Sequence, residues 1–293
     1  MQKRHPVSLA TREARWGYFM IAPMVLGMLI FFYLPLGASF LIGFTKWDVL
    51  TSPQWIGLEN YIRLFKTHLF YKTLWNTTRY ALMLVPLGMT VSLVLALALN
   101  TSIRFRSIYR LIYFLPVLTV PVAIALVWQW IYNPQYGLLA QVFGLKLTWL
   151  TDMKMALPAL VFMAVWMSCG YGMVIFLAGL QNIPRIYYEA AEVDGASRWH
   201  QFVYITLPLL TPTIFFNLLT SLISAFQTFD IVYIMTQGGP LDSTRTMVYT
   251  IWEDAFHYFR MGSATAQAWI LFAIILIISL IQFRSQKRWV YYG

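Results

Sequence analysis

The residues best suited to chemistry in this 293-residue chain lie in one short segment, 181–202. Its centre holds Glu189, Ala190 and Ala191, followed by Asp194, Gly195 and Ala196. Pro184 is typical of a helix start and Gly195 of a left-handed helix end, so a short helix is predicted over Pro184–Asp194. Ser197 is expected to cap a second helix.

Small alanines permit close approach of another protein, and Glu189 offers a charge to a basic partner. The segment therefore indicates a docking site, although a plain surface helix under a bundle would have a similar pattern.

The long apolar runs lack the groups that catalysis or ion coupling requires. None of the six runs given below contains Asp, Glu, Lys, Arg or His. A proton- or ion-coupled carrier usually places such groups at membrane depth. The chain also has no metal-ligand spacing of His and carboxylates and no G-x-x-x-x-G-K-[ST] phosphate loop. We therefore expect no catalytic residue, no metal and no cofactor, and any ATP hydrolysis would come from a partner protein.

The elements that position these residues are predicted to be membrane-spanning helices. Hydrophobic residues make up 59% of the chain and charged residues only 11%, whereas soluble domains have about 25% charged residues. A span needs about 20 apolar residues. Six uncharged runs reach that length: Trp16–Phe44, Tyr80–Leu99, Leu111–Tyr132, Met155–Leu180, Val203–Phe229 and Met261–Phe283. The fold class is accordingly all-α, a polytopic membrane protein with six transmembrane helices.

The distribution of basic residues predicts the orientation of the six spans in the lipid bilayer. Segments 1–15, 100–110, 181–202 and 284–293 hold 12 of the 21 Lys and Arg residues, and the longer segments on the other side hold 9. The positive-inside rule then places both termini in the cytoplasm. This topology explains the net charge of +10 without nucleic acid. The expected organisation is a cytoplasmic tail (1–15), a permease domain (16–283) with a cytoplasmic loop (181–202), and a second tail (284–293).

The cytoplasmic loop also carries a sequence resemblance. The pattern E-A-A-x-x-D-G-A-x-x-x-x-x-F-x-x-I-x-L-P is filled from Glu189 through Pro208. It resembles the signature loop of the membrane subunits of binding-protein-dependent ABC importers. Over nearly the whole chain the sequence is similar to the maltose-type sugar permeases of bacterial inner membranes. Supporting pieces are the run Ile56–Tyr61, the Asn133-Pro134 and Tyr136-Gly137 pairs, and the segment Thr236–Pro240, which is similar to the F-type subunit of such a pair.

The resemblance implies partners and a substrate site. Such a permease pairs with a second, homologous permease, binds two ABC ATPase subunits in the cytoplasm and receives a sugar from an extracytoplasmic binding protein. Glu189, Ala190, Ala191, Asp194, Gly195 and Ala196 would belong to the coupling helix that contacts the ATPase. Counting from Glu189 to the depth at which these permeases hold sugar gives Trp166, Ser168, Tyr171, Thr220, Ser224 and Gln227. Aromatic faces and neutral hydroxyls suit a saccharide.

Several alternatives stay open from the sequence. The aromatic residues could serve helix packing, and Ser and Thr often bond their own helix backbone in membranes. The lack of Lys or Arg within the spans disfavours glycerol phosphate or another dianion as cargo, although the partner permease could supply a positive group. A permease for another small solute and a stand-alone secondary carrier are further alternatives, and an integral-membrane enzyme lacks a catalytic constellation.

Overall fold

A computed structural model describes residues 9–101 and 103–291 of the chain, and these residues are mostly helical. The elements in chain order are α1 (Leu9–Met28), the π-helical η1 (Leu29–Tyr33), α2 (Leu34–Ile42), β1 (Thr45–Lys46), β2 (Gln54–Trp55), α3 (Glu59–Lys66), α4 (His68–Leu99), α5 (Arg106–Leu118), α6 (Pro121–Ile131), α7 (Leu138–Phe143), α8 (Ala156–Gln181), α9 (Arg185–Val193), α10 (Arg198–Gln201), η2 (Phe202–Thr206), α11 (Leu207–Leu209), α12 (Thr211–Phe226), α13 (Asp230–Met235), α14 (Met247–Trp252), η3 (Glu253–His257) and α15 (Met261–Trp289).

The centre of the bundle is α8, which packs along α4 and also contacts α5 and α12. This helix is apolar on all sides and most of its length is buried, as expected for the middle of a helical bundle. Close approach to α4 depends on Gly172, because a Cβ there would lie 2.5 Å from Ser92 Oγ. Ser92 Oγ in turn donates a hydrogen bond to the Cys169 carbonyl at 3.1 Å. Small residues at a helix contact are the usual device for tight packing in membranes.

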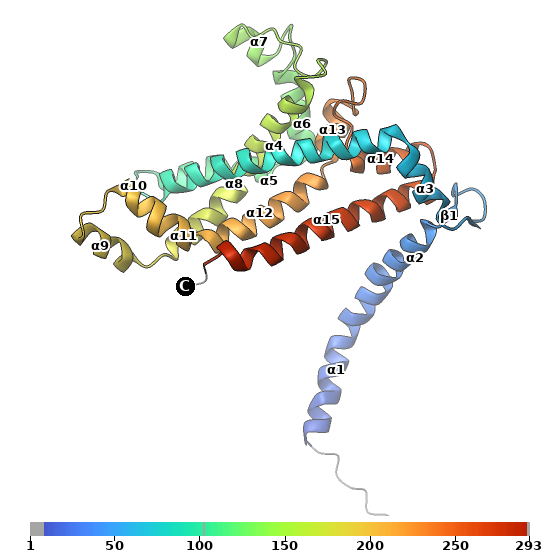
Figure 1. Ribbon diagram of the computed structural model, residues 1–293, viewed down its shortest axis with the longest axis horizontal. Coiled ribbons are helices and arrows are strands. Elements are labelled where there is room, and N and C mark those ends of the chain that lie inside the picture. Colours follow the sequence, from blue (N-terminus) through green and yellow to red (C-terminus); the bar gives the residue numbers. More distant parts are fainter. Residues whose placement is uncertain (1–8, 102, 292–293) are drawn as a thin grey trace, which may run out of the picture.

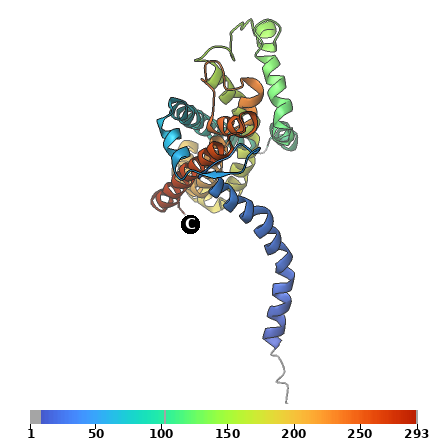
Figure 2. The ribbon, with the colours of Figure 1, turned by 90° about the vertical axis from the view of Figure 1, so that its right-hand side faces the viewer.

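The first helical segment, α1 to α2, leaves the bundle and extends away from it (Figures 1 and 2). None of the described side chains between Leu9 and Ile42 is buried. Large apolar residues such as Phe19 and Phe31 are therefore exposed along its whole length. Only its end is fixed to the bundle, where Trp269 of α15 packs edge-on against Phe40.

Two of the six predicted spans are broken in the structure. The run Leu111–Tyr132 is divided into α5 and α6, which meet at an angle of 99°, and the run Val203–Phe229 is bent by 63° before α12. Pro121 explains the first break, because the residue before a proline is held in extended conformation and proline has no N–H for the helix. Among the described residues, four helices are long and apolar enough to cross a membrane, or up to six if each bent pair is one span.

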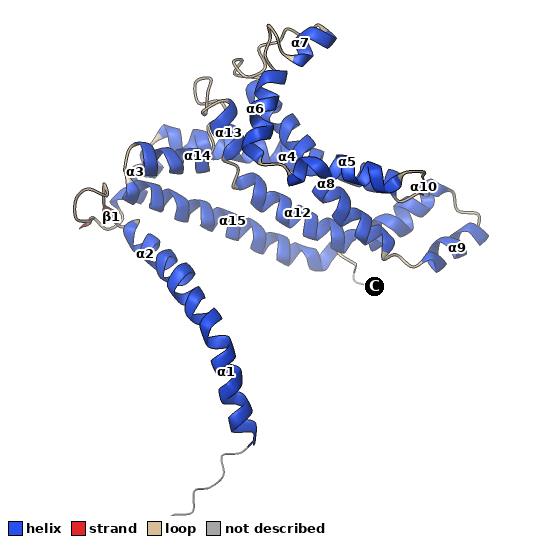
Figure 3. Cartoon of the chain, turned by 180° about the vertical axis from the view of Figure 1, so that it is seen from behind, coloured by secondary structure: helices blue, strands red, loops and turns tan. Residues whose placement is uncertain are grey.

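The two ends of the bundle differ in structure (Figure 3). One end carries α9, α10 and the end of α15. The opposite end carries α3 and the short antiparallel hairpin β1–β2. There Asn60 is buried and donates hydrogen bonds to the carbonyls of Gly43 and Thr45, at 3.0 and 2.8 Å. The run Ile56–Tyr61 thus fixes the hairpin against the bundle.

Candidate functional site

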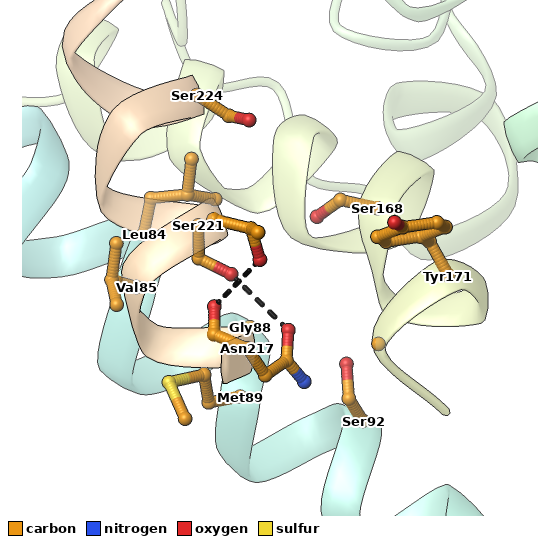
Figure 4. Close-up of a pocket in the computed structure, with 12 residues that line it drawn as sticks. Leu84, Val85, Gly88, Met89, Ser92, Ser168, Tyr171, Asn217, Ser221 and Ser224 are labelled. Atoms are coloured by element: carbon orange, nitrogen blue, oxygen red, sulfur yellow. Dashed lines mark hydrogen bonds between the residues drawn. The ribbon is translucent and has the colours of Figure 1, made fainter. Parts of the chain in front are cut away.

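A cavity of about 120 Å³ lies between α4, α8 and α12, midway along the bundle. Figure 4 shows side chains of these three helices converging on it. Its lining consists of Leu84, Val85, Gly88, Met89, Ser92, Ser168, Tyr171, Gly172, Asn217, Thr220, Ser221 and Ser224. None of these described lining residues carries a charge. The structure therefore brings four residues predicted from the sequence, Ser168, Tyr171, Thr220 and Ser224, to one uncharged cavity that holds both apolar and polar side chains.

Two hydroxyl groups of the cavity are held by their own helices. Ser168 Oγ donates to the Ala164 carbonyl at 2.8 Å, and Thr220 Oγ1 donates to the Phe216 carbonyl at 3.0 Å. This is the backbone bonding expected of Ser and Thr in an apolar helix. Each hydroxyl oxygen keeps lone pairs that can accept from a ligand. The ring of Tyr171 is half exposed at the cavity and can supply an apolar face.

Asn217 is the main cavity residue that the sequence prediction missed. It is buried, its Oδ1 faces Ser221 Oγ at 3.4 Å, and its Nδ2 has no hydrogen-bond partner among the described residues. A buried polar group without a partner is costly and suggests a ligand or an unfilled contact. The signal that could have found it is an amide within the apolar run Val203–Phe229. Ser92, Ser221 and Gly172 were also missed.

Two predicted residues lie outside this cavity. Trp166 is two positions before Ser168 in α8, so the two side chains point about 200° apart around the helix axis. The Trp166 ring packs against the Trp128 ring, with 5.6 Å between their centroids. Gln227 directly follows Phe226, the last residue of α12, and its side chain is exposed. The structure thus does not bring Trp166 and Gln227 together with the other four predicted residues.

The cavity can bind a small neutral ligand in part, but one chain encloses little of it. Ligand pockets usually measure about 300–1,000 Å³, and this cavity of about 120 Å³ is well below that range. Its polar groups are hydroxyls and one amide, which exchange hydrogen bonds with other neutral polar groups at no cost in buried charge.

The cytoplasmic loop predicted from the sequence has the predicted local structure. Helix α9 begins after Pro184 and ends before Asp194, and Gly195 has φ of +74°. Ser197 caps α10 and accepts a hydrogen bond from the His200 N–H. Glu189 is exposed and forms no ion pair with a described residue. The loop therefore presents an exposed helix whose charge is available to a partner.

A polar contact links α9 to the rest of the bundle. Tyr188 Oη and Thr206 Oγ1 are 2.9 Å apart, which links α9 to the segment that leads into α12. Ile186 and Val193 are exposed on α9, with 69% and 89% of their surface accessible. The contact joins α9 to the segment that continues into α12, one of the helices that line the central cavity.

The structure is a helical bundle with several apolar helices long enough to cross a membrane, an uncharged central cavity and an exposed loop at one end of the bundle. Residues 85–291 match the model of the binding-protein-dependent transport system inner membrane component family, and the chain belongs to this family. It is 41% identical over 284 residues to the probable ABC transporter permease protein YesP of Bacillus subtilis, covering 94% of this chain and 92% of that protein. It is 33% identical to the sn-glycerol-3-phosphate transport system permease protein UgpA of Pectobacterium atrosepticum, covering 94% and 95%.

The fold is similar to that of a solved transporter. A chain of a bacterial ABC transporter involved in the import of the acidic polysaccharide alginate superimposes with a TM-score of 0.84 at 24% identity, covering 94% of this chain and 96% of that chain. At this identity the likeness concerns the fold. The chain is thus an inner membrane component of a binding-protein-dependent transport system with the helical permease fold of such transporters.

Proposed function

We propose that this chain is one permease subunit of an ATP-driven importer and that its cargo is a neutral mono- or oligosaccharide. The observation that supports this cargo is the cavity between α4, α8 and α12, whose lining holds hydroxyls, an amide and an aromatic ring but no charge. Sugars present hydroxyls to such groups and apolar ring faces to a tyrosine. A phosphate group would instead need a cationic partner. Ser168, Tyr171, Asn217, Thr220, Ser221 and Ser224 are the proposed sugar contacts.

A second permease subunit is the proposed partner within the membrane. The cavity of one chain is too small for a sugar, which supports a second wall from a homologous subunit. The exposed apolar helix from Leu9 to Ile42 supports the same conclusion, because it contacts the described bundle near its end, at Phe40, and none of its described side chains is buried. An extracytoplasmic binding protein would deliver the sugar, and two ABC ATPase subunits would supply the energy.

The cytoplasmic loop is the proposed contact with an ATPase. Residues Glu189, Ala190, Ala191, Asp194, Gly195 and Ala196 would form the coupling surface, with α9 moving as a rigid unit when the ATPases close. The exposed apolar side chains of α9 and the unpaired Glu189 support a protein partner at this place. In this mechanism the ATPase biases a two-state permease, and the chain itself contributes no catalytic residue.

The proposed topology has six spans and both termini in the cytoplasm. It counts α5–α6 and α10–α12 as two bent spans. A break in a membrane-spanning helix is tolerated where neighbouring helices cover the exposed backbone. The distribution of Lys and Arg supports the orientation. The domains would then be the tail 1–15, the permease domain 16–283 with its loop 181–202, and the tail 284–293. Residues 1–8, 102, 292 and 293 lie outside the described part.

Glycerol phosphate is the second candidate cargo. It is favoured by the name of the relative that is 33% identical to this chain. In that case a positive group from the partner permease would have to bind the phosphate, since the described cavity has none. The stand-alone carrier and the membrane enzyme have no comparable support.

Uptake by the reconstituted complex tests both the mechanism and the cargo. The tagged chain is purified with its associated subunits, placed in liposomes with the binding protein, and supplied with labelled neutral sugars or labelled sn-glycerol 3-phosphate. We expect ATP-dependent uptake of a neutral sugar that glycerol phosphate does not inhibit and that a proton gradient does not drive. Uptake of glycerol phosphate without competition from neutral sugars would overturn the cargo, and uptake driven by the proton gradient would overturn the importer.

A further inference from the structure

A second cavity, of about 500 Å³, lies at the end of the bundle that carries α3 and the β1–β2 hairpin. Its walls come from α3, the start of α4, the 242–245 loop, α14, η3 and the start of α15. Under the proposed topology this end is extracytoplasmic. The cavity shares no lining residue with the central cavity, and its volume lies within the range of small-molecule sites.

Apart from Asp254, the charged side chains that line this cavity are paired or engaged. Arg245 forms ion pairs with Asp242, at 2.7 Å, and with Glu253. Arg63 pairs with Glu59 at 2.7 Å, and the Arg260 guanidinium lies over the Tyr258 ring at 5.0 Å. Lys72 Nζ lies 4.0 Å from Asp242 Oδ2, the carboxylate oxygen that Arg245 does not contact. An added ion would disturb this balance, so a neutral ligand fits the cavity better than a charged one.

Two groups of the lining have hydrogen-bonding capacity left. Gln267 is 1% exposed, and its Oε1 has no hydrogen-bond partner among the described residues. It lies six residues into α15, about 9 Å along the helix from Met261 at 1.5 Å per residue, so it forms the deep part of the cavity. Asp254 accepts one side-chain hydrogen bond, from Ser263 at 3.1 Å, and forms no ion pair with a described residue. Burial raises the pKa of Asp254, which indicates that its carboxyl group is incompletely compensated.

We propose that this cavity is a second saccharide-binding site, in which Gln267 and Asp254 bind hydroxyl groups and the Tyr258 ring covers an apolar sugar face. Amide and carboxylate groups offer two atoms in one plane, which suits adjacent hydroxyls of a sugar ring. The hydroxyls of Thr250 and Ser263 add further donors and acceptors, and the lining as a whole holds three basic and three acidic residues. This site would hold a sugar at the outer end of the subunit, separate from the central cavity. The inference rests on the proposed function, because it takes the same class of cargo.

Equilibrium binding to the purified complex tests the site. The probe is the labelled neutral sugar taken up in the transport experiment, added to the complex in nanodiscs without binding protein. We expect Gln267→Leu and Asp254→Asn to weaken one component of sugar binding about tenfold, and Asn217→Leu to weaken the other. Gln282→Leu is the matched control, because Gln282 is a second glutamine of α15 with an unpartnered Oε1 but lies outside the cavity.

The outcomes separate the two proposals. If Gln267→Leu and Asp254→Asn bind sugar as the unaltered complex does while Asn217→Leu loses binding, the second site is wrong and the central site stands. If the unaltered complex binds no neutral sugar at all, the proposed cargo is wrong. If the two variants keep sugar binding but lose association with the binding protein, the cavity is a contact site for the binding protein and the saccharide proposal is overturned. Asp254→Asn keeps the shape of the side chain, so its sugar binding tests the second site even if the Gln267→Leu protein does not fold.

Discussion

The 181–202 loop takes all its proposed contact residues from one continuous stretch of chain, whereas the central cavity takes its lining from three helices that are far apart in sequence. In the loop, Gly195 and Ser197 each determine the backbone of their own turn. In the cavity, the contributions of Gly172 and Asn217 depend on the helices that pack against them. The comparison teaches that the proposed energy-coupling element is a local structure on the surface, while the proposed cargo site depends on the packing of the whole bundle.

The largest expected effect is in the loop. Gly195 has φ of +74°, and a Cβ there would meet nothing within 4 Å. The Cβ of Gly195→Arg therefore meets no clash, but the substitution strains the backbone by about 1–2 kcal/mol and places a large side chain on the proposed docking surface. We expect transport to fall to background while the protein still inserts in the membrane.

Copurification of the ATPase, followed by mass spectrometry, measures the effect of Gly195→Arg directly. Gly144→Arg is the matched control, because Gly144 also has positive φ and open space but ends α7 at the other side of the molecule. Normal uptake by the Gly195→Arg protein would remove the coupling role of the loop.

The next effect is expected in the cavity. Asn217→Leu removes the buried amide whose Nδ2 is unpartnered, and with it one proposed hydrogen bond to the sugar. A lost hydrogen bond of about 1–1.5 kcal/mol corresponds to roughly a tenfold weaker interaction. The half-saturating sugar concentration should rise by that factor while ATPase copurification stays normal. An unchanged concentration would exclude Asn217 from the site.

A pair of glycine variants separates packing from binding within the cavity. Gly172→Ala forces a Cβ to within 2.5 Å of Ser92 Oγ, so we expect a loss of stability of about 1–3 kcal/mol. Gly88→Ala also adds a methyl group to the cavity lining, but nothing lies within 4 Å of its Cβ. This variant should keep its thermal stability and bind the cargo more weakly. Equal melting temperatures for the two proteins would contradict the tight contact between α4 and α8.

The smallest effect is expected from Glu189→Ala. Its side chain is exposed and has no ion pair within the described chain, so its removal leaves α9 intact. An exposed charge pair contributes little, and the loss of ATPase association should be about fivefold or less. Increasing ionic strength should weaken the unaltered complex more than the variant. If the variant and the unaltered protein retain the ATPase equally at every salt concentration, Glu189 is not an anchor.

The sequence determined the elements whose signals are local. Proline and glycine delimited α9, Ser197 capped α10, and the apolar runs marked the positions of α4, α8 and α15. These features depend on backbone conformation and hydropathy, which a few neighbouring residues set. The breaks at Pro121 and before α12 were less certain from sequence, because a proline in a membrane helix can kink it slightly or end it, depending on which neighbours bond the freed carbonyl groups.

Only the tertiary structure decided which polar residues share a site. It grouped Ser168, Tyr171, Thr220 and Ser224, separated Trp166 and Gln227 from them, and added Asn217 and Ser92 from the facing helices. The rotation of each helix about its axis decides which side chains converge, and that rotation is set by close contacts such as Gly172 against Ser92. Sequence spacing gives the depth of a residue in a membrane helix, but packing between distant segments gives its direction.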